Sequence, residues 1–219
     1  MPMRPRTRRI LVFFATAVGI VLLWNTPILY PLRIFVVLLH ELSHGLAAVA
    51  TGGGIERIVL TPDEGGETLT RGGSAILTLS AGYLGSLAWG ALILSAARLK
   101  NAGHVLAFLG LAVLALTALY IRSLFGFAFG LLFGAAALVG GRRLPHRAVA
   151  WLLLVVGLTS CMYAVLDIKS DILDRPDLPS DARMLSHLTH IPVLAWGVLW
   201  LAISLAVSWS VFRRSLARG

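Results

Sequence analysis

The chain has 219 residues, of which 58% are apolar and only 13% charged, and its mean hydropathy is +0.84. Because a soluble domain carries about a quarter charged residues, this composition excludes a disordered chain, a disulfide scaffold and an ordinary cytosolic enzyme. It indicates a polytopic membrane protein whose helices face lipid. The net charge of +9 comes from arginines that flank apolar runs, which favours anionic lipid headgroups over nucleic acid as the partner. The single cysteine, Cys161, has no partner for an internal disulfide.

The chain begins with the basic stretch MPMRPRTRR, and an apolar run from Ile10 to Trp24 follows it. Such a start resembles a secretory signal, but no small-residue cleavage site comes after it and a second apolar segment begins almost at once. We therefore expect an uncleaved first transmembrane helix whose N-terminus lies in the cytoplasm.

The second apolar segment, 31–51, contains His40, Glu41 and His44, and a Gly-Gly-Gly run ends it. The next segment, 55–71, has a different pattern. IERIVLT is β-prone and roughly alternating, PDEGG is typical of a turn, and ETLTR reads as a second short strand. The sequence therefore predicts a small β-hairpin inserted between two transmembrane helices.

Four more apolar segments follow the hairpin. As a single helix, the stretch 105–140 would be roughly 54 Å long, far beyond a hydrocarbon core of about 30 Å, so we expect two helices that turn near Arg122. Stripes of small residues at helical spacing predict close helix packing. The segments are 73–97, 105–140, 148–168 and 191–212, and the stripes are Gly82, Ser86 and Gly90, and Gly126, Gly130 and Gly134.

These segments predict an all-α polytopic membrane protein of about seven transmembrane helices, with six as the alternative, in one integral membrane domain over residues 1–219. With the N-terminus inside, seven crossings place several arginines outside, against the positive-inside tendency. A re-entrant loop at 105–140 would instead move those charges inside. The residues concerned are Arg142, Arg143, Arg147, Arg213 and Arg214.

The segment that indicates chemistry most clearly is HELSH at 40–44. His40 and His44 are four residues apart on a helix, so both imidazoles face one side and can chelate one metal ion. Glu41 can reach a water held by that metal and act as the general base. Ionisable residues inside a span are costly unless something compensates them, and the alternative is hydrogen-bonded polar contacts between helices. Two imidazoles and a carboxylate suit Zn²⁺ best.

A catalytic zinc ion usually has three protein ligands, so the third must come from elsewhere in the chain. Asp167 ranks first, because it follows the apolar run of the sixth span and intramembrane acids are functional by default. Asp171, one helical turn further on the same face, is the second choice. The other candidates lie in turns or loops, where such groups are usually solvated: Asp63, Glu64, Glu67, His104, His187 and His190.

The chain resembles the site-2 protease family of intramembrane zinc metallopeptidases. The matching pieces are HELSH inside a span, a hairpin-like segment directly after it, a Gly-rich span next, and Leu-Asp at 166–167 at the end of a later span. The likeness covers about residues 31–171 and points to the compact bacterial branch that lacks a PDZ domain. It implies that His40, His44 and Asp167 bind Zn²⁺ and that Glu41 is the general base.

The resemblance also bears on orientation. In the family, the zinc site opens toward the cytosol, and the motif helix and the Asp helix both run from outside to inside. Seven crossings with the N-terminus inside give the second and sixth helices this shared direction, so the resemblance favours seven crossings over the re-entrant loop. The chain departs from the family at Ile168, where Gly is usual, and no Asn-Pro precedes Asp167.

The sequence thus predicts an intramembrane metalloendopeptidase that hydrolyses a peptide bond in or near a transmembrane segment of a membrane-protein substrate. We expect an integral protein of a bacterial plasma membrane, whose partners are the substrate and the lipid bilayer rather than nucleic acid. The hairpin edge offers a place for strand addition by an extended peptide. Two alternatives are a non-catalytic membrane scaffold that keeps a metal site and a small ion or proton transporter. The substrate, the substrate-binding residues and the oligomeric state stay open.

Overall fold

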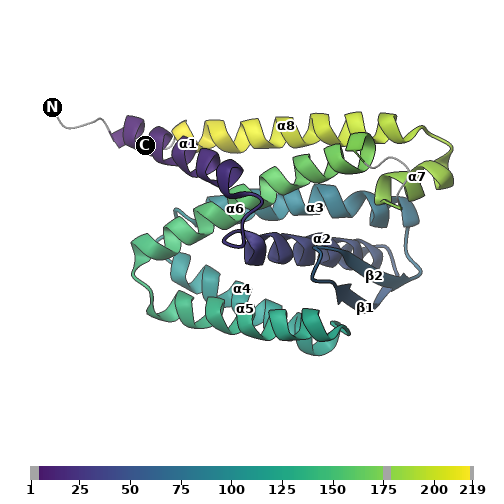
Figure 1. Ribbon diagram of the computed structural model, residues 1–219, viewed down its shortest axis with the longest axis horizontal. Coiled ribbons are helices and arrows are strands. Elements are labelled where there is room, and N and C mark those ends of the chain that lie inside the picture. The colour runs from purple at the N-terminus through teal and green to yellow at the C-terminus, as the bar shows by residue number, and fades with distance from the viewer. Residues whose placement is uncertain (1–4, 175–178, 218–219) are drawn as a thin grey trace.

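The computed structural model describes residues 5–174 and 179–217. Long helices form a bundle, and a two-stranded sheet packs at one end of it (Figure 1). The all-α fold with a small hairpin is thus confirmed. In chain order the elements are α1 (Pro5–Leu23), α2 (Tyr30–Ala50), β1 (Gly54–Leu60), β2 (Gly66–Arg71), α3 (Ala75–Ala96), α4 (Ala102–Leu119), α5 (Leu124–Arg143), α6 (His146–Lys169), the π-helical turn η1 (Ser170–Asp174), α7 (Asp181–Thr189) and α8 (Val193–Ala217).

Six of the described helices are long and apolar enough to cross a membrane, so the chain is an integral membrane protein. These are α2, α3, α4, α5, α6 continued through η1, and α8, whereas α1 contributes a shorter apolar stretch, Ile10–Leu23. The helix count is close to the predicted seven and equals the alternative of six. The stretch 105–140 forms two helices that break beside Arg122, as predicted.

Serine side chains define where three of the helices begin. Ser74, Ser123 and Ser180 are extended residues, and each hydroxyl accepts a hydrogen bond from the N–H three positions later. This contact satisfies one of the free amides in the first helical turn. Ser180 matters most for the site described below, because it fixes the start of the short helix α7.

Glycines allow α4 and α5 to pack almost backbone to backbone. A Cβ on Gly110 would lie 2.6 Å from the carbonyl oxygen of Gly134, and one on Gly103 would lie 2.6 Å from that of Gly141. The small-residue stripe of α5 therefore serves helix packing. These contacts also show that α4 begins beside the point where α5 ends.

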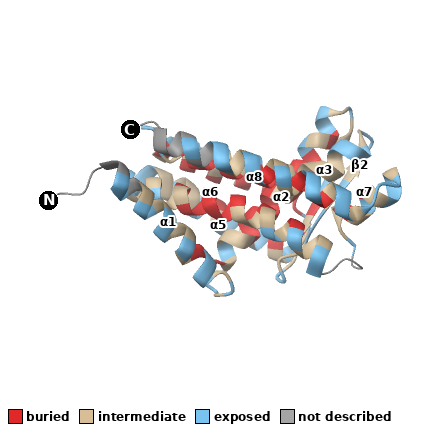
Figure 2. Ribbon diagram, turned by 90° about the horizontal axis from the view of Figure 1, so that it is seen from above, coloured by how far each residue is buried: buried red, intermediate tan, exposed pale blue. Residues whose placement is uncertain are grey.

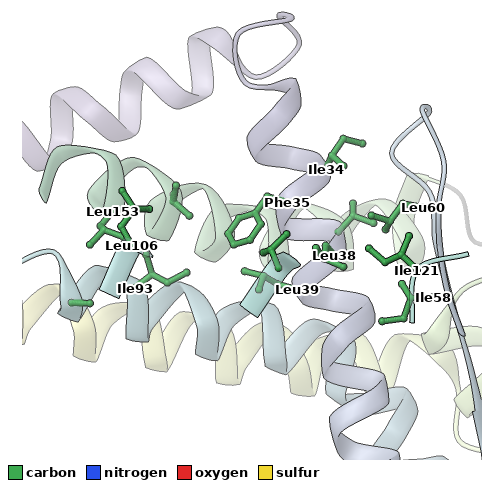
Figure 3. Close-up of a cluster of buried hydrophobic side chains, with 14 of the residues drawn as sticks. Ile34, Phe35, Leu38, Leu39, Ile58, Leu60, Ile93, Leu106, Ile121 and Leu153 are labelled. Carbon is green, nitrogen blue, oxygen red and sulfur yellow. The ribbon is translucent and has the colours of Figure 1, made fainter. Parts of the chain in front are cut away.

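Helix α2 lies at the centre of the bundle. In an apolar stretch of 18 residues of α2, 67% of the residues are buried, against 17% in the corresponding stretch of α8. Its Phe35 stacks on Phe133 of α5 with 4.5 Å between the ring centroids. Its Ile34 and Leu38 share one buried cluster with the inner face of the hairpin (Figure 3). The motif on α2 is therefore surrounded by protein, while exposed residues lie on the outer sides of the bundle, where lipid would contact them (Figure 2).

The hairpin is attached to the bundle along β1. The strands are antiparallel, with Gly54 opposite Arg71 and Leu60 opposite Gly66. On the other edge of β1, the amide of Ile58 donates to Tyr120 O at 2.9 Å, and the turn between α4 and α5 is thereby joined to the sheet. Within the described part of the chain, no strand pairs with the outer edge of β2.

Candidate metal site

Two histidines from α2 and one aspartate from α7 form a compact group. The imidazole centroids of His40 and His44 are 4.8 Å apart, and Asp181 Oδ2 lies 3.1 Å from Nε2 of each ring. Ligands of a tetrahedral zinc ion at about 2.0–2.1 Å are separated by roughly 3.3 Å. The three atoms therefore have the chemistry and the spacing of a zinc donor set, and among the described residues this is the one group of at least three His, Cys, Asp or Glu side chains that could hold a metal ion.

Hydrogen bonding fixes the tautomer of His44. Its Nδ1 lies 2.7 Å from the carbonyl oxygen of Thr78. A carbonyl oxygen only accepts, so this nitrogen carries the proton and Nε2 points at the Asp181 carboxylate. Two groups with lone pairs that face each other at 3.1 Å require a cation between them, either a second proton or a metal ion.

Asp181 is brought to the histidines by the packing of α7. It is the first residue of that helix, and the next turn buries Ala182 and Leu185 in a cluster with Tyr83 and Trp200. Burial alone would raise the pKa of Asp181, but hydrogen bonds with His40 and His44 hold that pKa well below its usual range. The carboxylate is therefore ionised at neutral pH, as a metal ligand must be.

Glu41 lies beside this group and is held by the hairpin. The Thr68 hydroxyl lies 2.7 Å from Glu41 Oε2, to which it can donate a hydrogen bond, and the Glu41 side chain is 6% exposed. Gly66 allows β2 to approach, because a Cβ there would lie 2.7 Å from Glu41 Cγ. The carboxylate faces a cavity of about 630 Å³ that the two histidines, Asp181, β2, α3 and α6 also line.

The structure places Asp167 and Asp171 on the same cavity but outside the compact group. Asp167 Oδ2 lies 3.7 Å from His40 Nδ1, the ring nitrogen opposite the one that faces Asp181. Asp171 Oδ2 accepts a hydrogen bond from the Tyr83 hydroxyl at 2.5 Å. The assignment of Asp167 as third ligand stays a prediction from the sequence.

The other candidates from the sequence do not join the group. Glu64 and Glu67 line the cavity at the hairpin, and Glu64 is paired with Arg33 at 2.9 Å. Asp63 lies in the exposed hairpin turn. His104 lies in the first turn of α4, His187 lies in the last turn of α7, and His190 directly follows that helix.

Sequence reasoning missed Asp181, although a local signal was present. Ser180 followed by Asp181 is typical of a helix start, and it precedes a short amphipathic segment between two apolar spans. An acid in the first turn of such a helix is favourable on its own, so the signal indicates the helix but not the ligand.

The absence of a side chain at Gly82 leaves room for the imidazoles of His40 and His44 beside α3. A Cβ there would lie 2.6 Å from His40 Cε1 and 2.7 Å from His44 Cε1. We expect Gly82→Ala to displace the rings and to weaken zinc binding by about tenfold or more, as supporting contacts of metal ligands do. Competition with a chromogenic chelator measures this affinity. Gly19→Ala, which meets nothing within 4 Å, is the matched control, and an unchanged affinity in Gly82→Ala would contradict the packing argument.

The family comparison agrees with this geometry. A family model described as Peptidase M50B-like matches residues 13–211, which is nearly the whole chain. Comparisons with curated proteins and with solved structures gave no match. Since the matched region contains α2, the hairpin, α6 and α7, it includes every residue of the site. The chain therefore belongs to the Peptidase M50B-like family, within the site-2 proteases.

Proposed function

We propose that the protein is an intramembrane zinc metalloendopeptidase that hydrolyses a peptide bond in or near a transmembrane segment of another membrane protein. The observation that carries the proposal is the group of His40, His44 and Asp181, with Glu41 beside it, on one cavity between apolar helices. Family membership supports the same conclusion, because the family is that of zinc-dependent membrane peptidases.

The ligand set favoured by the geometry is His40, His44 and Asp181. Their nearest nitrogen and oxygen atoms converge on one point, whereas the Asp167 carboxylate approaches the far side of the His40 ring. A carboxylate in that position is typical of a group that orients a metal-binding imidazole. We therefore propose Asp181 as the third ligand and Asp167 as the residue that positions His40.

Each polar group then has a role in hydrolysis. A zinc ion held by His40, His44 and Asp181 would supply Lewis-acid chemistry toward water and the scissile carbonyl. Glu41, held by Thr68, accepts the proton of the attacking water and returns it to the leaving amine. The low dielectric of the surrounding helices strengthens these electrostatic contributions.

The substrate must be presented in an extended form, because a helix hides its carbonyls in its own hydrogen bonds. Strand β2 lines the cavity beside Glu41 with residues 66–70. Its outer edge is unpaired among the described strands, so it can align an extended peptide by strand addition. A peptide bound in this way would lie next to the three proposed ligand residues.

Metal analysis tests the proposal directly. Purified protein should contain about one zinc per chain, and a His40→Ala, His44→Ala double variant should contain none. In proteoliposomes, the wild-type chain should cleave a transmembrane peptide and lose this activity on chelation. Bound zinc without any cleavage would favour a scaffold, and zinc flux into the vesicles would favour a transporter.

A further inference from the structure

The two ends of the bundle differ in charge. At the end opposite the metal site, the turn between α3 and α4 carries Arg98 and Lys100, and the turn between α5 and α6 carries Arg142, Arg143 and Arg147. α1 starts and α8 finishes at this same end, with the sequences RTRR and RR (Figure 1). The described residues of these four segments include no Asp or Glu.

The metal-site end contains the acidic residues instead. All described Asp and Glu residues lie in the motif of α2, in the hairpin, at the end of α6 and η1, or at the start of α7. This end also carries single basic residues, which among the described residues are Arg33, Arg57, Arg71, Arg122, Lys169 and Arg183, and three of them are matched by these acids or by backbone. Arg33 pairs with Glu64 at 2.9 Å, Lys169 pairs with Asp174 at 2.7 Å, and the guanidinium of Arg122 donates to the carbonyl of Ile121 at 3.0 Å.

Helices α1 and α2 run in the same general direction, so the chain does not turn back between them. Helix α1 leads inward from the basic end, and α2 continues from there toward the hairpin (Figure 1). Trp24, just after α1, lies 6.3 Å from Tyr163 of α6, and the Arg33 guanidinium of α2 lies 5.9 Å from the Trp24 ring. Because Tyr163 also lines the metal-site cavity, α1 and α2 turn within the bundle and together lead once from the basic end to the metal-site end.

Because α1 and α2 together make one crossing, the number of membrane crossings no longer conflicts with the positive-inside tendency of the arginines. The seven-crossing interpretation counts α1 as a complete span and therefore leaves the arginines of the α5–α6 turn and of the α8 end outside. In the structure, those arginines share one end with the start of α1. A single orientation then places the basic clusters of the α3–α4 turn, the α5–α6 turn, the start of α1 and the end of α8 together on the cytoplasmic side, as the positive-inside tendency favours, while Arg122 of the α4–α5 turn lies at the other end.

We infer that the metal site opens on the non-cytoplasmic face of the membrane, the reverse of what the resemblance to site-2 proteases implies. The inference rests on the proposed function and specifies its substrate class. The substrates are membrane proteins whose scissile bond lies in the non-cytoplasmic half of the bilayer or at its outer boundary. Thr78 and Gly82, which contact the histidines, lie in the first two turns of α3, so the site is close to that face.

Cysteine labelling in intact cells tests this orientation. The native Cys161 is buried and gives the background. Asp63→Cys places a thiol in the exposed hairpin turn, and Lys100→Cys places one in the exposed turn between α3 and α4. A maleimide that does not cross the plasma membrane should label Asp63→Cys in intact cells and Lys100→Cys only after the membrane is opened.

The opposite pattern, or equal labelling of both variants in intact cells, would overturn the inference. The outcome does not depend on catalysis, because neither position belongs to the metal site. Zinc content measured on the same two variants separates the two proposals. Normal zinc with reversed labelling refutes only the orientation, whereas absence of zinc from the wild-type chain refutes the function and leaves the labelling result valid.

Discussion

Asp181→Asn should remove stoichiometric zinc from the purified protein, whereas Asp167→Asn should keep zinc and bind it about 10–100-fold more weakly. The difference follows from position. Asp181 Oδ2 lies 3.1 Å from Nε2 of both imidazoles, so its loss removes a ligand. Asp167 lies 3.7 Å from the other nitrogen of His40, so its loss frees that ring to rotate but leaves three donors.

The measurement is zinc content after dialysis, followed by affinity in competition with a chelator. Asp174→Asn is the matched control, because Asp174 is a half-exposed acid of the same segment that pairs with Lys169. Should Asp167→Asn lose zinc while Asp181→Asn keeps it, the original prediction from the sequence holds and the ligand set proposed from the geometry is wrong. Asp171→Asn adds a third comparison. Asp171 accepts a hydrogen bond from Tyr83, so this variant should keep zinc and lose no more affinity for it than Asp167→Asn does.

The motif helix and the hairpin could be predicted because their signals are local. A spacing of four residues places His40 and His44 on one face of any α-helix, whatever surrounds it. The β-prone segments on either side of a turn likewise specify a hairpin with their own residues. The two-helix interpretation of 105–140 needed only the length of an α-helix and the thickness of a bilayer.

The sequence could not indicate Asp181 as a candidate ligand, because its proximity to the histidines depends on tertiary packing. Hydropathy favours Asp167, which directly follows an apolar run, and the structure indeed places it on the cavity. Asp181 comes from a polar connection, and it reaches the histidines only because Ala182 and Leu185 pack beneath Tyr83 and Trp200. No pattern within the connection specifies which helices will receive it.

The path of α1 was hidden for a similar reason. An apolar run of suitable length indicates contact with lipid or with a core, but not how far the helix travels across the bilayer. Ile20 of α1 is 3% exposed and packs with Leu158 of α6 inside the bundle. The turn that follows α1 therefore lies against protein, where irregular backbone is tolerated at membrane depth.

Glu41→Gln should keep zinc and lose nearly all proteolysis, with a fall of about 10²–10⁴-fold in the cleavage rate. Glutamine has the size of glutamate, and its amide oxygen can still accept the hydrogen bond from Thr68. It cannot take a proton from water, so only the acid–base step is removed. Since Glu41 is absent from the compact group of ligands, the affinity for zinc should stay within a few-fold of the wild-type value.

Single-turnover cleavage in proteoliposomes, with zinc content measured on the same samples, makes the comparison. Thr68→Val is the matched control, because it removes the hydroxyl that holds Glu41 but leaves the carboxylate, and it should slow cleavage much less than Glu41→Gln. Full activity in Glu41→Gln would show that another group accepts the proton, and loss of zinc in that variant would make Glu41 a ligand. A fall in rate with zinc retained separates an enzyme from a scaffold, because a site that only binds metal has no use for a base at this position.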